Sequence, residues 1–175
     1  VWASTWNTEL LNRVGAALGR EALENNISGW YSPAINLHRS PFSGRNFEYY
    51  SEDPLLTGKI AAAVVSGASE AGMYCYIKHF ALNDEETRRN EFLAMWATEQ
   101  AMRELYFKAF EIPVKEAKMT INYTADENGT MAQKTMRAAT AIMASQNCIG
   151  QYYCHADYRL LTGMLRNEWG FLGTV

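Results

Sequence analysis

Hydrophobic and polar residues follow two different periods along the chain, and the longer period predicts helices. Apolar residues recur every three or four positions in four segments, which is the spacing of one face of an α-helix. Asn7 and Pro54 are start signals for two of these helices, Gly170 is a C-cap signal for the last, and Pro113 is expected to kink or divide the third. The four predicted helices cover residues 7–26, 54–70, 97–117 and 158–171.

Short apolar runs between the helices predict β-strands. Because strands alternate with helices, the pattern favours parallel βα units and an α/β fold. After the third helix, Asp126, Asn128 and Gly129 give a turn signal, so residues 118–133 are expected to form a hairpin-like or irregular insertion. The predicted strands are a short one within 28–37 that ends near Pro33, then 72–77, 138–145, and a run that begins at 173.

Polar loops follow three of the predicted strands, at residues 38–48, 78–86 and 145–155. In parallel βα units the carboxyl ends of the strands meet at one edge, where ligands bind. Arg45, Lys78 and His79 are therefore expected to share a crevice. Their side chains can bond to hydroxyl oxygens, and nearby aromatic rings could cover the faces of a sugar; the candidates are Trp30, Tyr31, Phe42 and Tyr49.

Each of these residues also has a purely structural interpretation. Arg45 could pair with Glu48 or Glu52 and stiffen its loop, and His79 could be a core histidine. Lys78 is harder to explain in this way, because lysine is rarely buried without a partner. Glycine-rich phosphate loops and the usual histidine spacings for metal are absent, which disfavours a nucleotide or metal site, and no cofactor is expected.

Composition limits the classes of partner. The chain has 175 residues, is 48% hydrophobic, and carries a net charge of −3 with scattered basic residues, so we expect one packed domain and no nucleic-acid partner. Neither a membrane-spanning run nor a signal peptide is visible, but both ends look truncated, so the compartment stays open. The cysteines are expected to be small core residues rather than disulfide or metal ligands; they are Cys75, Cys148 and Cys154.

Two stretches, "SPFSGRNFEYYSEDPLLTG" and "KHFALNDEETRRN", resemble glycoside hydrolase family 3, the β-glucosidase type. The resemblance covers nearly the whole chain, and its motifs are specific in combination. In the N-acetylhexosaminidase branch of this family, "KHF" is followed by Pro-Gly-His-Gly. Here it is followed by "ALND", so the resemblance favours the glucosidase or xylosidase branch. The matching residues are Gly44 to Glu48, Tyr50 to Pro54, Lys78 to Phe80, Asn83, and Glu86 to Arg89.

The resemblance implies that residues 1–175 are part of a (β/α)8 TIM-type barrel, the N-terminal catalytic domain of a retaining enzyme that cleaves terminal β-linked glycosides. Arg45, Lys78 and His79 would bind sugar hydroxyls, while Arg39 and Glu48 would position Arg45. No catalytic carboxylate is expected within the chain. The nucleophilic aspartate would follow shortly after the last residue, and the acid/base residue would come from a second domain.

Three further expectations follow from the resemblance. Gln146 stands where the family often has Tyr or Phe, which leaves the choice of sugar open, and the insertion at 118–138 is longer than in many relatives. An incomplete barrel leaves strand edges unpaired, so the isolated chain should self-associate or need the missing domains of its parent chain. The alternatives are a noncatalytic carbohydrate-binding or regulatory barrel module and a purely structural α/β fragment.

Overall fold

The computed structural model describes residues 1–175, and the strands of its main sheet alternate with helices as the sequence predicts. The principal helices are α1 (Thr8–Glu24), α2 (Pro54–Glu70), α3 (Glu99–Ala101) and α4 (Lys108–Glu116), with π-helical segments at Met102–Tyr106 and Arg159–Glu168. The strands are β1 (Gly29–Trp30), β2 (Tyr74–Phe80), β3 (Ala94–Met95), β4 (Lys118–Thr124), β5 (Met131–Arg137), β6 (Ala141–Ala144), β7 (Cys148–Ile149) and β8 (Tyr152–Tyr153).

The main sheet is parallel and its strands lie in the order β1-β2-β6. A bridge between Ala34 and Lys78 continues the first pairing beyond Pro33, and a bridge between Ala141 and Thr174 places the start of a fourth parallel strand beside β6. Successive strands are therefore neighbours, as in a (β/α)8 barrel. The predicted α/β, TIM-type fold is confirmed, although the strands present do not close into a barrel.

The two long helices begin where their capping residues predict. The side chain of Asn7 accepts a hydrogen bond from the Leu10 N–H at 2.9 Å, and Asp53 accepts one from the Leu56 N–H at 2.8 Å. Pro54 follows at the first helical position, where its missing N–H costs no hydrogen bond. None of the helices combines the length and the apolar character that crossing a lipid bilayer requires.

The third predicted helix is interrupted at a different place from the one expected. Pro113 lies inside α4 and does not divide it. The interruption is instead the π-helical turn, where the Phe107 N–H reaches the Met102 carbonyl at 2.7 Å. The last helix ends as predicted at Gly170, which has a φ of +68°.

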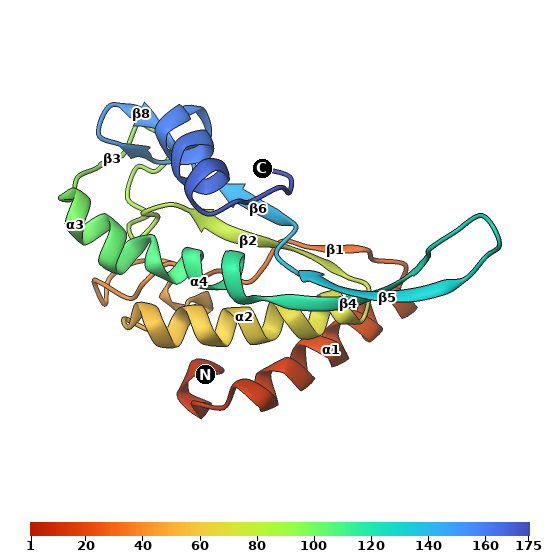
Figure 1. Ribbon diagram of the computed structural model, residues 1–175. Helices are drawn as coiled ribbons and strands as arrows, with labels where there is room; N and C mark the ends of the chain where they lie inside the picture. Colours follow the sequence, from red (N-terminus) through yellow and green to blue (C-terminus); the bar gives the residue numbers. More distant parts are fainter.

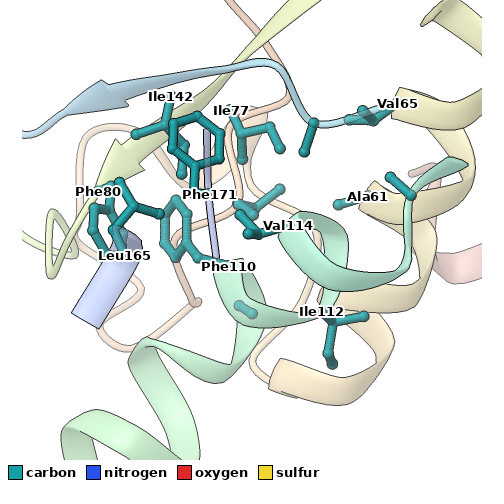
Figure 2. Packing of buried hydrophobic residues seen from close by; sticks show 14 of the residues in the cluster. Ala61, Val65, Ile77, Phe80, Phe110, Ile112, Val114, Ile142, Leu165 and Phe171 are labelled. Carbon is teal, nitrogen blue, oxygen red and sulfur yellow. The ribbon is translucent and has the colours of Figure 1, made fainter. Parts of the chain in front are cut away.

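The hydrophobic core lies between the sheet and α2 with α4, and Phe80 at the end of β2 packs within it (Figure 2). The Phe80 ring is fully buried and lies 5.2 Å from the ring of Phe110 and 5.6 Å from that of Trp169, measured between centroids. Burying an aromatic side chain of this kind contributes about 2–3 kcal/mol. This packing holds the last residues of β2 in place.

A projecting hairpin and a small sheet complete the structure. The predicted insertion is a regular antiparallel hairpin, β4–β5, that extends away from the rest of the molecule (Figure 1). Its turn contains Gly129 at a φ of +82°. The segment 145–155, expected as a loop, contains β7 and β8, which form a short sheet with β3 in the order β3-β7-β8. Strands of two residues are too short for a sequence period to reveal them.

Helices α1 and α2 approach closely because glycines lie at their contact. A Cβ atom built on Gly67 would lie 1.9 Å from the Asn12 carbonyl oxygen, and one on Gly15 would lie 2.2 Å from that of Val64. Both neighbours are backbone atoms, which cannot rotate away. The close approach of the two helices therefore requires the absence of a side chain at these positions.

Gly67→Ala is therefore expected to lower the free energy of unfolding by about 2–3 kcal/mol, since the added methyl group forces the helices apart. Gly163→Ala is the matched control, because its nearest neighbour would be 3.9 Å from the new Cβ. Urea unfolding of both variants of the full-length protein measures the difference. Equal stability of the two variants would show that the helix contact is not tightly packed.

Candidate functional site

The predicted crevice exists at the carboxyl ends of the main-sheet strands. A pocket of about 240 Å³ brings together Arg45 from the loop before α2, Lys78 and His79 from β2, and Gln146 from the segment after β6. Tyr31 also lines it, whereas Phe42 is almost fully exposed elsewhere and Tyr49 is buried behind it. The complete lining is Tyr31, Arg45, Lys78, His79, Asn83, Arg89, Met143, Ser145 and Gln146.

An irregularity in β2 allows two consecutive residues to line this pocket. Ile77 pairs with Ile142 and Phe80 pairs with Ala144, so β2 advances three residues while β6 advances two. This is the count of a β-bulge, which re-aims side chains near active sites. In a regular strand, neighbouring side chains point to opposite faces. Here Lys78 and His79 both reach the pocket, and Phe80 still reaches the core.

Two carboxylates hold the cationic side chains of the pocket. The Glu48 carboxylate accepts a hydrogen bond from Arg45 Nε and lies 3.3 Å from Lys78 Nζ. The Glu86 carboxylate lies 3.8 Å from Arg45 Nη1 and 3.1 Å from Arg89 Nη1. These pairs are partly buried, so solvent screens them less than surface pairs. Three positive and two negative side chains leave one net positive charge.

Arg89 and Asn83 are pocket residues that the sequence-based site did not include. Asn83 Nδ2 donates to Glu86 Oε1 at 2.7 Å, and the Tyr49 hydroxyl donates to the Asn83 carbonyl at 2.8 Å. This network fixes the Glu86 carboxylate between Arg45 and Arg89. Both residues lie within the motif "KHFALNDEETRRN", so their position beside Lys78 and His79 in sequence was the available signal.

His79 is an uncharged histidine. Burial is the main reason that its pKa falls from 6.5 to about 3, and the positive charges of Arg45, Lys78 and Arg89 lower the pKa further. The imidazole therefore stays neutral at ordinary pH and can both donate and accept one hydrogen bond. This neutrality agrees with the core-histidine interpretation, but the ring also lines the pocket.

The remaining predicted residues lie at the edge of the pocket or behind it. Gln146 is exposed at the rim. Glu48 contacts Arg45 as expected, but Arg39 does not: its guanidinium lies over the ring of Tyr106, 5.6 Å from the centroid. The prediction that Arg39 positions Arg45 has no direct contact to support it. The three cysteines are buried free thiols.

Asp84 is a buried acid directly behind the pocket. Its Oδ1 accepts the Leu37 N–H at 2.9 Å, whereas Oδ2 has no partner. Burial raises the pKa of this carboxyl to about 7, against the smaller lowering effects of the Leu37 N–H and of Arg39. Asp84 thus links the segment after β1 to the segment after β2.

These features together define a class of site. No three histidine, cysteine or acidic side chains gather where they could hold a metal ion. Three cationic donors, a neutral imidazole and an aromatic ring surround a small open pocket at the carboxyl edge of a barrel-type sheet. Such a pocket suits a neutral ligand that carries several hydroxyl groups, as a sugar does.

Comparisons with known protein families assign the chain. The model for the glycosyl hydrolase family 3 N-terminal domain matches residues 1–175, and the chain therefore belongs to this family. Beta-glucosidase A of Butyrivibrio fibrisolvens is 43% identical over 99% of this chain and 18% of its own length. The exo-alpha-(1->6)-L-arabinopyranosidase of Bifidobacterium longum is 37% identical over 99% of the chain and 20% of its length.

Solved structures agree with this assignment. Beta-glucosidase 3B from Thermotoga neapolitana, in complex with glucose, superposes with a TM-score of 0.84 and 39% identity; the match covers 99% of this chain and 22% of that one. The Bifidobacterium adolescentis family 3 beta-glucosidase gives a TM-score of 0.83 and 34% identity; the match covers 99% of this chain and 23% of that one. The chain thus spans about a fifth of the length of these relatives.

Asp84→Asn is expected to change how stability depends on pH. Because the folded pKa of about 7 exceeds the ordinary 3.8, the folded protein keeps a proton that the unfolded chain loses, and stability falls as pH rises from about 4 to 7. Relative to wild type, the variant should gain about 3 kcal/mol between pH 4.5 and pH 8. Urea unfolding at both values measures this gain.

The matched control is Asp53→Asn, which makes the same change at an exposed helix cap. A stability difference between Asp84→Asn and wild type that stays constant across this pH range would contradict the prediction.

Proposed function

We propose that this chain is the sugar-binding part of the N-terminal barrel of a retaining β-glycosidase of the β-glucosidase or β-xylosidase type, which hydrolyses terminal β-linked glycosides. The observation that carries the proposal is the convergence of Lys78 and His79 from β2 with Arg45 from the loop before α2 in one pocket at the carboxyl edge of the sheet. Membership of glycosyl hydrolase family 3 supports the reaction class.

In the proposed complex, Arg45, Lys78 and Arg89 donate hydrogen bonds to sugar hydroxyls. The Glu48 and Glu86 carboxylates hold these donors in fixed positions before the substrate arrives, which lowers the cost of ordering them on binding. Hydrogen bonds to ring hydroxyls that strengthen as the oxocarbenium-like transition state forms lower its energy relative to that of the bound substrate. The residues thus serve both binding and catalysis.

The two catalytic carboxylates are proposed to lie outside residues 1–175. Glu48 and Glu86 are each engaged with two cations, so neither is free to attack an anomeric carbon. Thr174 begins a strand beside β6, pairing with Ala141. At about 3.3 Å per residue, a few more residues of this strand would reach the level of Ser145 at the pocket. A nucleophilic aspartate placed there would face the sugar.

A noncatalytic carbohydrate-binding module is the second candidate, because the same pocket would serve it. The exposed Gln146 at the rim and an arabinopyranosidase among the relatives leave the preferred sugar open. The remainder of the parent chain is proposed to complete the barrel, since the β1 edge and the Thr174 edge of the sheet are unpaired. A chain without these parts should self-associate.

Activity of the full-length protein tests the proposal. It should hydrolyse p-nitrophenyl β-glucoside, β-xyloside or α-L-arabinopyranoside, and Lys78→Met should lower kcat/KM about 100-fold or more by removing a charged hydrogen-bond donor. Lys59→Met is the control, because Lys59 pairs with Glu116 on the surface. Sugar binding without turnover would favour the noncatalytic module instead.

Glu48→Gln should lower kcat/KM about 10- to 100-fold, although Arg45 and Lys78 themselves are unchanged. The reason is that neither cation then has the negative charge of Glu48 to hold it in place. Glu52→Gln is the matched control, since Glu52 is exposed and forms no ion pair. Steady-state kinetics on both variants gives the comparison. If the two variants are equally active, the carboxylate of Glu48 does not organise the pocket.

A further inference from the structure

Asn36 is a buried amide behind the pocket that makes three polar contacts with one residue, His79. Asn36 Nδ2 donates to the His79 carbonyl at 3.0 Å, and the His79 backbone N–H donates to Asn36 Oδ1 at 2.9 Å. The same Oδ1 lies 3.2 Å from Nδ1 of the His79 ring. The Asn36 side chain thus contacts both the backbone and the imidazole of a pocket residue.

The backbone of His79 fixes which way the Asn36 amide points. A carbonyl can only accept a hydrogen bond, so the group that faces it must be the Asn36 NH₂. A backbone N–H can only donate, so the group that faces it must be the Asn36 oxygen. The atom 3.2 Å from Nδ1 is therefore an acceptor, and the proton of the neutral imidazole resides on Nδ1.

The other ring nitrogen, Nε2, is then left with a free lone pair. Nε2 makes no hydrogen bond within the protein, yet it is not among the fully buried polar atoms that lack a partner. Because His79 lines the pocket, this nitrogen is open to a ligand there. We propose that Asn36 is a positioning residue that holds His79 as its Nδ1–H tautomer, so that Nε2 accepts the proton of a sugar hydroxyl.

This role rests on the proposed function and adds something the other pocket residues cannot supply. Arg45, Lys78 and Arg89 can only donate hydrogen bonds. Each hydroxyl that accepts from one of these cations still has its own proton to place, and His79 Nε2 provides an acceptor for it. A protonated His79 would carry hydrogen on both nitrogens, and this acceptor would be lost.

The charged groups around His79 keep it neutral. Arg45 faces it from the loop before α2, Lys78 from its own strand, and Arg89 from the loop after β2. Glu48 and Glu86 contact those cations rather than the imidazole. Tyr49 presents its ring at 6.4 Å between centroids, and the lining residues that follow β6, Ser145 and Gln146, do not ionise.

Asn36→Asp in the full-length protein tests this assignment. The new carboxylate keeps an acceptor at Nδ1 but adds a negative charge, which raises the pKa of His79. As pH falls through the raised pKa, Nε2 becomes a donor, so the acidic fall in kcat/KM, about tenfold per pH unit, should begin at a higher pH in the variant than in wild type, whose own fall comes from its catalytic carboxylates. Recovery of activity at alkaline pH on the same sample demonstrates that the variant is folded.

Asn12→Asp is the matched control, because Asn12 lies on α1 and contacts the Ala63 carbonyl far from His79 in sequence. Its pH profile should follow that of wild type. A folded Asn36→Asp variant whose profile also follows wild type from pH 5 to pH 9 would overturn the proposal, because a His79 that acts as a donor loses nothing on protonation.

A second measurement does not depend on a variant at position 36. Inhibition by glucose and by its deoxyfluoro derivatives is compared between wild type and His79→Ala. Fluorine can accept but not donate, so at one hydroxyl position the exchange should weaken binding at least fivefold more in wild type than in His79→Ala. A difference within twofold at every position overturns the proposal. Failure of wild type to bind glucose or to cleave any glycoside would instead overturn the proposed function.

Discussion

One extra residue in β2 is the constraint on which the pocket depends. The strand must place Ile77 and Phe80 in the core, where they are fully buried, and it must also deliver Lys78 and His79 to the opposite side. Strict alternation cannot do both, because it would turn one of the two polar side chains into the apolar interior. The bulge resolves this conflict. The aromatic packing around Phe80 then fixes the position of the bulge relative to the neighbouring strands.

The position of Lys78 and His79 in the pocket also determines which of its groups are charged and which are neutral. Arg45 and Lys78 are both positively charged and repel one another. The Glu48 carboxylate contacts both side chains and offsets this repulsion. The resulting positive field and the burial of the ring both oppose a proton on His79. The pocket therefore combines donors held in place by carboxylates with one neutral imidazole, an arrangement that can bond to several hydroxyl groups at once.

The sequence predicted those features that depend on neighbouring residues in the chain, such as the start of a helix or the end of a strand. Pro54 marks the start of α2, and the position of Lys78 and His79 directly after a predicted strand placed them in the pocket. Asn36 could not be found in this way, because in "PAINL" it appears as one polar residue in an apolar run and its partner lies 43 residues later. Arg39 was assigned by motif, and only three-dimensional contacts show that it meets Tyr106.

The β4–β5 hairpin leaves the fold just before β6 begins and projects from the end of the sheet at which β6 starts (Figure 1), whereas the pocket lies at the carboxyl ends of the strands. It is joined to the core at its base, and most of its side chains are exposed. None of the residues that line the pocket lies on this arm, so a change in its length leaves the lining of the pocket intact. The same independence makes the turn at Asn128 and Gly129 a natural place to graft a peptide tag or a reporter without touching the pocket.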